Sequence, residues 1–99
     1  MLYQVEQTEI FKKWYRDLAD LRAKTAIYRR LDNATVGLLG DVKPVGEGIS
    51  EMRVNVGAGY RLYFTVKNRS IVFLLCGGDK STQDADIKRA KKLAKENNS

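Results

Sequence analysis

The fold is decided by residues 51–66, which read EMRVNVGAGYRLYFTV. Apolar and polar residues alternate on both sides of the central Gly-Ala-Gly, as in strands whose successive side chains point to opposite faces of a sheet. Three small residues suit a short hairpin loop. With a loop over residues 57–59, the expected cross-strand pairs are Val56–Tyr60, Asn55–Arg61, Val54–Leu62 and Arg53–Tyr63.

This pairing gives the hairpin one apolar and one polar face. The apolar face, which belongs in the core, would carry Met52, Val54, Val56, Leu62 and Phe64. The polar face would bring together Arg53, Asn55, Arg61 and Tyr63. Guanidinium groups bind phosphate by two-point contacts, so two of them on neighbouring strands form a rigid anion site. A solvated sheet face with ordinary cross-strand pairs of arginine and tyrosine explains the same pattern equally well.

The segments before the hairpin are expected to form a strand and two helices. Residues 2–8 alternate like a short strand, and the period becomes helical after Thr8, a suitable N-cap. A second helix is expected from near Asp20 towards Val36, and the two should form a helical hairpin. Residues 41–45 contain the single proline and indicate an edge strand or a loop.

The segments after the hairpin are expected to form one more strand and a last helix. Residues 71–76 are an apolar strand that Gly77 and Gly78 should end, and Ser81 to Asp84 resembles a capping box. The chain is therefore expected to be a single domain over residues 1–99 of the α+β class. In it, an N-terminal strand and a helical hairpin pack on an antiparallel β-meander, and a helix closes the chain.

The composition excludes several kinds of site. The chain has 18 Lys and Arg against 12 Asp and Glu, and its net charge of +6 favours a polyanionic partner. It has no histidine and a single cysteine, which excludes histidine-based triads, internal disulfides and cysteine-rich zinc sites, so no metal or cofactor is expected. The longest apolar run is far shorter than the roughly 20 residues that span a bilayer, and the N-terminus lacks a signal-peptide layout. A cytoplasmic protein without a membrane partner is expected.

A second candidate site follows the apolar strand, where residues 76–83 read CGGDKSTQ. The glycines would let the backbone approach a ligand, and a helix beginning near Ser81 would direct free N–H groups at it. Asp79 and Lys80 would add an acid and a cation. The segment is not a phosphate-binding P-loop, because Asp79 separates the glycines from the lysine. The alternative is a plain connection between a strand and a well-capped helix.

Three segments resemble those of a known family: residues 41–53 (DVKPVGEGISEMR), 59–64 (GYRLYF) and 74–81 (LLCGGDKS). They resemble the RelE/ParE superfamily of toxins from type II toxin–antitoxin modules, and most closely its HigB-like, phage-related branch. The resemblance implies a RelE-like fold and an mRNA interferase that acts in the ribosomal decoding site. Such toxins cut mRNA through attack of a ribose 2′-hydroxyl on the adjacent phosphate. The hairpin arginine of the family corresponds to Arg61, a basic residue of the preceding strand to Arg53, and a cation after the last strand to Lys80.

These arguments yield two groups of candidate site residues. The expected catalytic residues are Arg53, Arg61, Lys80 and Asp79, and the expected RNA-binding residues are Lys43, Asn55 and Tyr63. The arginines would stabilise the negative charge that builds on the phosphoryl oxygens. Without histidine, the proton must be moved by Glu51, Asp79, Lys80, Tyr63, ribosomal RNA or the substrate, and Lys80 and Asp79 are favoured. RelE itself carries a lysine where this chain has Glu51.

The expected partners are a cognate antitoxin of the helix-turn-helix type and mRNA on the ribosome. Acidic segments of the antitoxin would cover the cationic face. Three other functions fit the sequence. One is a ParE-like toxin that inhibits DNA gyrase, the second is a non-catalytic nucleic-acid-binding module, and the third is a prophage remnant that keeps the fold without the toxicity.

Overall fold

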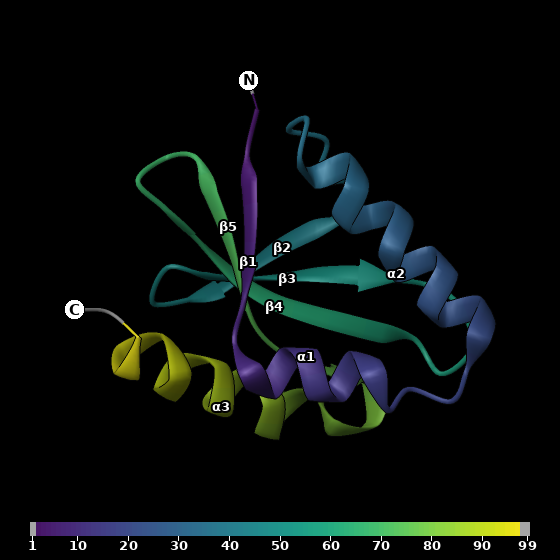
Figure 1. Ribbon diagram of the computed structural model, residues 1–99. Coiled ribbons are helices and arrows are strands. Elements are labelled where there is room, and N and C mark those ends of the chain that lie inside the picture. Colours follow the sequence, from purple (N-terminus) through teal and green to yellow (C-terminus); the bar gives the residue numbers. More distant parts are fainter. Residues whose placement is uncertain (1, 98–99) are drawn as a thin grey trace.

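A computed structural model describes residues 2–97 of the chain (Figure 1). The helices are α1 (Glu9–Arg16), α2 (Leu21–Ala34) and α3 (Gln83–Glu96), and a short 3-10 turn, η1 (Lys80–Thr82), precedes α3. The strands are β1 (Gln4–Gln7), β2 (Val42–Gly46), β3 (Ile49–Val54), β4 (Tyr60–Lys67) and β5 (Ile71–Asp79). None of the helices among these residues has the length and apolar composition needed to cross a membrane.

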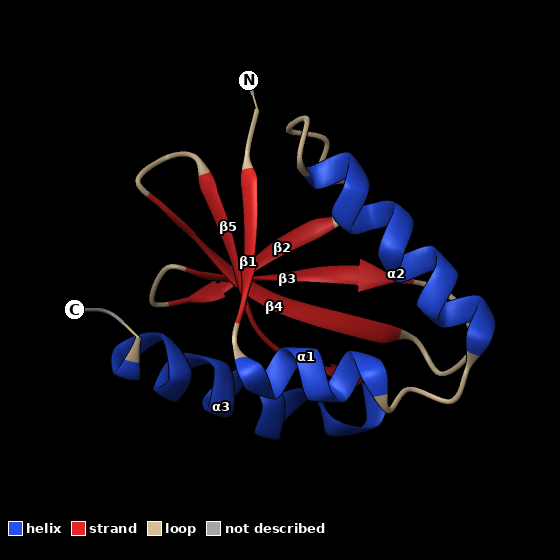
Figure 2. Cartoon of the chain, viewed as in Figure 1, coloured by secondary structure: helices blue, strands red, loops and turns tan. Residues whose placement is uncertain are grey.

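The strands form one sheet in the order β1-β5-β4-β3-β2. Strands β2 to β5 are an antiparallel meander, and β1 pairs in parallel with β5 at one edge. Figure 2 shows the strands in the middle of the molecule with the helices on the outside. The α+β class with a meander and a C-terminal helix, predicted from the sequence, is therefore confirmed.

The sheet separates the core into two clusters, one on each face, and helices cover both faces. Helices α1 and α2 cover the first face with Phe11 and Ile27, which pack on residues such as Met52, Leu62 and Leu74. Helix α3 covers the second face through Ala90 and Leu93, which pack with Ile49, Tyr63, Phe73, Leu75 and Cys76. Each fully buried large apolar side chain stabilises the fold by roughly 1.5–3 kcal/mol.

Two of the three helix starts follow the sequence signals. The hydroxyl of Thr8 accepts a hydrogen bond from the Phe11 amide at 3.0 Å, and the carboxylate of Asp20 accepts one from the Ala23 amide at 3.1 Å. Side chains of this kind satisfy backbone N–H groups that have no partner in the first helical turn. Helix α2 ends at Ala34, and Gly37 follows with a φ of +83°.

The hairpin register differs from the expected one. Arg53 lies opposite Arg61, and Val54 opposite Tyr60, so the expected pairing of Arg53 with Tyr63 was wrong. The loop spans residues 55–59, because the amide of Val56 bonds back to the carbonyl of Val54 at 2.9 Å and so leaves the ladder. Each residue of β3 therefore pairs with a residue of β4 two positions earlier in the chain than expected. Because side chains alternate with a period of two, the assignment of residues to faces survives.

Strand β5 continues three residues past its expected end at Cys76. Gly77 and Gly78 both lie inside the strand, so the prediction that they end it was wrong. A Cβ atom at Gly77 would lie 2.4 Å from the Trp14 ring, and one at Gly78 would lie 1.8 Å from a carboxylate oxygen of Asp86. These glycines therefore permit a close approach of α1 and α3 to the strand, and not the approach of a ligand that was expected from the sequence.

The turn before α3 is capped two residues earlier than expected. The carboxylate of Asp79 accepts hydrogen bonds from the Ser81 amide at 2.8 Å and from the Ser81 hydroxyl at 2.5 Å, and a capping box joins Asp79 to Thr82. The predicted box starting at Ser81 was therefore wrong. The extension of β5 moves the start of the turn back to Asp79, whose short acidic side chain serves as the cap.

Candidate active site

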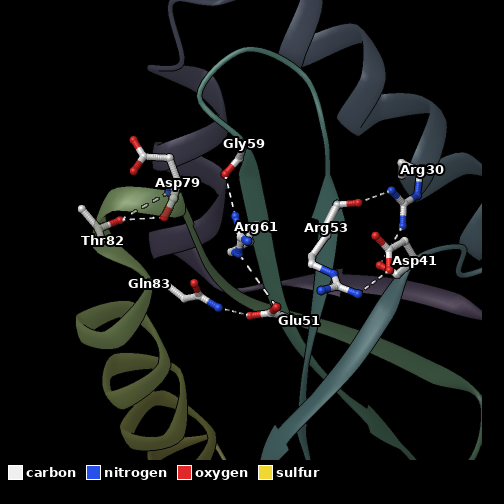
Figure 3. Close-up of polar contacts among 9 residues, drawn as sticks. All are labelled: Arg30, Asp41, Glu51, Arg53, Gly59, Arg61, Asp79, Thr82 and Gln83. Atoms are coloured by element: carbon white, nitrogen blue, oxygen red, sulfur yellow. Dashed lines mark hydrogen bonds and ion pairs between the residues drawn. The ribbon is translucent and has the colours of Figure 1, made fainter.

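The candidate site lies on the part of the second sheet face beyond the N-terminal end of α3. Figure 3 shows Arg53 and Arg61 on neighbouring strands, with Glu51 and Gln83 on the side towards α3 and Asp41 on the opposite side. The register places the two arginines directly opposite each other on β3 and β4. Their side chains are 34% and 12% exposed, respectively. Both guanidinium groups therefore share one sheet face, as expected, and neither belongs to the apolar core.

Arg53 is held from the β2 side. Its Nη2 donates to an Asp41 carboxylate oxygen at 2.8 Å, and its amide donates to the Asp41 carbonyl at 2.9 Å. The hydrogen bond to Arg53 lowers the pKa of Asp41, and the same bond raises the pKa of Arg53. Both groups are therefore charged at neutral pH. The Asp41 carboxylate is exposed, so the Arg53–Asp41 pair lies in contact with solvent.

Arg30, which was not predicted as a site residue, supports the site from α2. Its guanidinium donates to the carbonyl of Arg53 and, at 2.9 Å, to the carbonyl of Leu39. Burial lowers the pKa of Arg30. Arg30 thus has a structural role, because it fixes the backbone of β3 and of the segment before β2. The number of basic residues in the sequence does not predict this role, since it does not show which of them bond to the backbone.

Arg61 is held from the opposite side, by its own loop and by a buried acid. Its Nη1 donates to the Gly59 carbonyl at 3.0 Å, and its Nε lies 3.8 Å from Oε2 of Glu51. Glu51 is 1% exposed, and its Oε1 accepts a hydrogen bond from Gln83 Nε2 at 3.0 Å. The alternation of β3 already placed Glu51 on this face. Gln83 was missed, because it lies 32 residues away in the chain.

Tyr63 cannot bind RNA in this structure, so that prediction is corrected. Its side chain is fully buried in the cluster beneath α3, opposite Glu51 in the register. Its hydroxyl has no hydrogen-bond partner among the described residues, and burial raises its pKa. The physical reason is that α3 covers this part of the polar face, which a hairpin considered alone leaves open.

Lys43 and Asn55 both lie at the surface. Lys43 is exposed on β2 and pairs with Glu51 in the register, which places it on the same sheet face as the two arginines. Asn55 is exposed in the loop after β3, outside the ladder in which it was expected to face Arg61. Lys43 therefore extends the cationic face towards the β2 edge, and Asn55 lies at the end of the hairpin.

Asp79 and Lys80 differ in how free their side chains are. The carboxylate of Asp79 caps the η1 turn, and its hydrogen bonds from Ser81 lower its pKa, with a further contribution from the charge of Arg61. Lys80 is exposed. A Cβ atom built on Gly59 would lie 3.6 Å from both Lys80 Cβ and Arg61 Nη1, so both residues adjoin Gly59. Lys80 is therefore exposed near the loop that holds Arg61, whereas the carboxylate of Asp79 is engaged as a cap.

Two other kinds of chemistry have little support. Cys76 is fully buried, and burial raises the pKa of its thiol to about 12, so it is no nucleophile at neutral pH. Within residues 2–97, no three acidic or cysteine side chains cluster in a way that could hold a metal ion. The site consists instead of cations on a rigid sheet, which is suited to binding and stabilising a phosphate.

The chain is similar in sequence to one known protein and similar in fold to several solved structures. An uncharacterized protein of Haemophilus influenzae is 49% identical over 96 residues, which cover 97% of each chain. A free E. coli toxin RelE, mutated at two arginines, superposes with a TM-score of 0.72 at 19% identity over 93% of this chain and 98% of its own. The RelBE2 toxin–antitoxin complex of Mycobacterium tuberculosis contains a chain that matches with a TM-score of 0.64 at 20% identity, over 81% of this chain and all of its own.

The family of the chain follows from a match that covers most of its length. Residues 17–98 match the model of the family described as phage derived protein Gp49-like (DUF891). This match confirms the predicted resemblance to a phage-related family, and the fold is the RelE-like fold that the resemblance implied. The chain belongs to the Gp49-like family of phage-derived proteins.

Proposed function

We propose that this protein is the toxin of a type II toxin–antitoxin module and cleaves mRNA on the ribosome. The observation that carries the proposal is the pair Arg53–Arg61, two guanidinium groups opposite each other on a sheet face that α3 leaves partly uncovered. Lys43 and Lys80 add exposed cations on either side. Cations fixed on rigid strands stabilise transition-state charge without having to reorganise during the reaction.

The proposed reaction is an internal transesterification. The 2′-oxygen of a ribose forms a bond to the adjacent phosphorus, and the bond from phosphorus to the 5′-oxygen of the next nucleotide breaks. The 2′-hydroxyl loses a proton and the departing 5′-oxygen gains one. In this proposal Arg61 and Arg53 stabilise the charge on the phosphoryl oxygens. Lys80 is the proposed proton donor to the departing oxygen, because it is exposed and, like Arg61, adjoins Gly59. Asp79 is the weaker candidate, because it is engaged as a cap.

A cognate antitoxin is the proposed protein partner. The M. tuberculosis chain of this fold was solved in a toxin–antitoxin complex, and so was a further RelE chain from E. coli. The net charge of +6 suits a partner with acidic segments. The helix-turn-helix type of this partner follows from the sequence resemblance, as does action in the cytoplasm, where ribosomes and mRNA are found.

The test is cleavage of mRNA by the purified protein with and without ribosomes. We expect Arg61→Ala and Arg53→Ala each to lower the rate by about 10²–10³-fold, the loss typical of removing one transition-state donor. Arg22→Ala is the matched control, because it removes one exposed cation from α2, whereas Arg53 and Arg61 lie on β3 and β4. Lys80→Ala should reduce cleavage more than Asp79→Asn.

Two outcomes would contradict the proposal. If both arginine variants cut mRNA as fast as the Arg22→Ala control, the assigned site is wrong. If the unmodified protein leaves mRNA intact but blocks DNA supercoiling by gyrase, the protein acts as a ParE-like toxin. Salt-sensitive RNA binding without cleavage would indicate a binding module instead.

A further inference from the structure

The buried carboxylate of Glu51 has no part in the reaction as written above, although it lies next to Arg61 in Figure 3. One of its oxygens accepts the 3.0 Å hydrogen bond from Gln83, and the other faces Arg61 Nε at 3.8 Å. We propose that Glu51 and Gln83 form a latch that positions the Arg61 guanidinium for the scissile phosphate. Both are positioning residues, and the inference rests on the proposed role of Arg61.

Arg61 needs such support because of its length. A free arginine side chain has many rotamers, so it samples many orientations unless contacts restrict it. Here Nη1 is bound to the Gly59 carbonyl, and Nε faces the Glu51 carboxylate. Within residues 2–97, Nη2 takes part in no hydrogen bond or ion pair. The Gly59 carbonyl thus holds Nη1 by a hydrogen bond, the charge of Glu51 attracts Nε, and Nη2 is left for a ligand.

Glu51 in turn depends on Gln83. The carboxylate is 1% exposed, and a buried charge is costly unless hydrogen bonds and an opposite charge compensate it. Its separation of 3.8 Å from Arg61 Nε is too long for a hydrogen bond, so the amide of Gln83 is its side-chain donor. Gln83 is the first residue of α3. The orientation of Arg61 is thereby linked to the seating of α3 on the sheet.

The same contacts argue against a direct part for Glu51 in proton transfer. The carboxylate is almost fully buried, and its two oxygens face Gln83 and Arg61. Across the strand pair, its neighbour is the fully buried Tyr63. A group so enclosed does not reach a ribose hydroxyl at the surface. Its influence on the reaction passes through Arg61.

The first test observes Arg61 directly, without reference to activity. In ¹⁵N-labelled protein, the Nε–Hε signal of Arg61 is assigned from its loss in Arg61→Lys. We expect Glu51→Gln and Gln83→Ala each to shift this signal and to speed its exchange with water. Glu96→Gln, which removes one negative charge at the other end of α3, should leave it unchanged. An unshifted signal in folded Gln83→Ala protein would overturn the latch, even where Glu51→Gln fails to fold.

The second test separates positioning from direct catalysis by a double-mutant cycle. Glu51→Gln should lower kcat roughly 10- to 100-fold, the loss expected when a reacting group is misplaced by about 1 Å, with little change in KM. In an Arg61→Ala background the same substitution should have no further effect, since its target is gone. Additive losses, or a change in KM alone, would overturn the proposal. If the unmodified protein cuts no mRNA, the proposed function fails, whereas the spectroscopic test still decides on the latch.

Discussion

The second face of the sheet has a covered half and an open half, built from the same strands. In the covered half, α3 packs over Tyr63, Phe73 and Cys76. In the open half, β3 and β4 present Arg53 and Arg61. Tyr63 and Arg61 are two residues apart on one strand, yet one is core and the other is site. The extent of α3 thus decides whether a polar position of the hairpin is buried beneath the helix or stays accessible.

Glu51, Arg61 and Gln83 mark the boundary between the halves. On the buried side, the Arg61–Glu51 pair has side chains 12% and 1% exposed. On the open side, the Arg53–Asp41 pair has side chains 34% and 44% exposed. Desolvation makes the loss of one partner costly in the buried pair, whereas solvent compensates much of that loss in the exposed one. Substitution of Arg61 should therefore lower the free energy of unfolding more than substitution of Arg53, although both are proposed to bind the same phosphate.

The largest expected effect on stability comes from Arg61→Ala. Removing this cation leaves the buried Glu51 carboxylate without its opposite charge, and breaking a buried pair in this way costs about 3 kcal/mol or more. Arg53→Ala should destabilise the protein clearly less, because Asp41 returns to water. Urea unfolding of both variants measures the difference. Equal losses of unfolding free energy would remove the distinction between the two halves.

The second effect concerns the contact that seats α3 at the boundary. Gly78→Ala would place a Cβ atom 1.8 Å from the Asp86 carboxylate, which accepts a hydrogen bond from the Thr82 hydroxyl at 2.5 Å. Displacing this carboxylate should cost about 2 kcal/mol, as is usual for overpacking. Thermal unfolding measures this loss. Gly48→Ala is an informative control, since a Cβ atom there meets nothing within 4 Å and only its φ of +77° opposes the change.

A smaller effect is expected in the covered half, from Tyr63→Phe. The tyrosine hydroxyl is buried without a partner among the described residues, so its removal deletes an uncompensated polar group. The unfolding free energy should stay the same within about 0.5 kcal/mol, or rise. mRNA cleavage should also be unchanged, because the hydroxyl does not reach the surface. A large loss of cleavage with intact stability would return Tyr63 to the list of site residues.

The smallest effect is a dependence on pH in the open half. Because Arg53 lowers the pKa of Asp41 below its usual value of 3.8, the folded state binds the Asp41 proton less readily than the unfolded state does. The resulting stability is fully present above pH 3.8 and is lost as the pH falls through the lowered folded value. Asp41→Asn should therefore reduce stability at neutral pH and make no difference in strong acid. Unfolding curves of both proteins at neutral pH and near pH 2 would show it, and a constant difference would contradict this account.

Much of the fold was predictable, because it depends on local patterns. The alternation in β3 and β4 identified both strands and their faces, and Thr8 and Asp20 marked the starts of two helices. One error lies where a local rule conflicts with a tertiary contact. Gly77 and Gly78 were predicted to end the strand, yet both lie within β5. Glycine is needed at these positions because Trp14 and Asp86 occupy the space that a side chain would fill.

The candidate site was predictable in part for the same reason. The common face of Arg53 and Arg61 follows from a side-chain period of two, which a shift of the register by an even number leaves intact. The burial of Tyr63 and the contact of Gln83 with Glu51 follow from where α3 lies. No periodicity within the hairpin carries that information. The catalytic roles of these residues stay predictions.

The amino-acid sequence by itself determined the class of the fold, the faces of the strands and the excess of cations that one face presents. It did so because strand periodicity, capping residues and net charge are properties of neighbouring residues in the chain. Only the tertiary structure decided which polar residues of that face are accessible, which acid lies beside Arg61, and which glycines accommodate a helix. These depend on contacts between segments far apart in the sequence, whose positions are set by the packing of α1, α2 and α3 on the sheet.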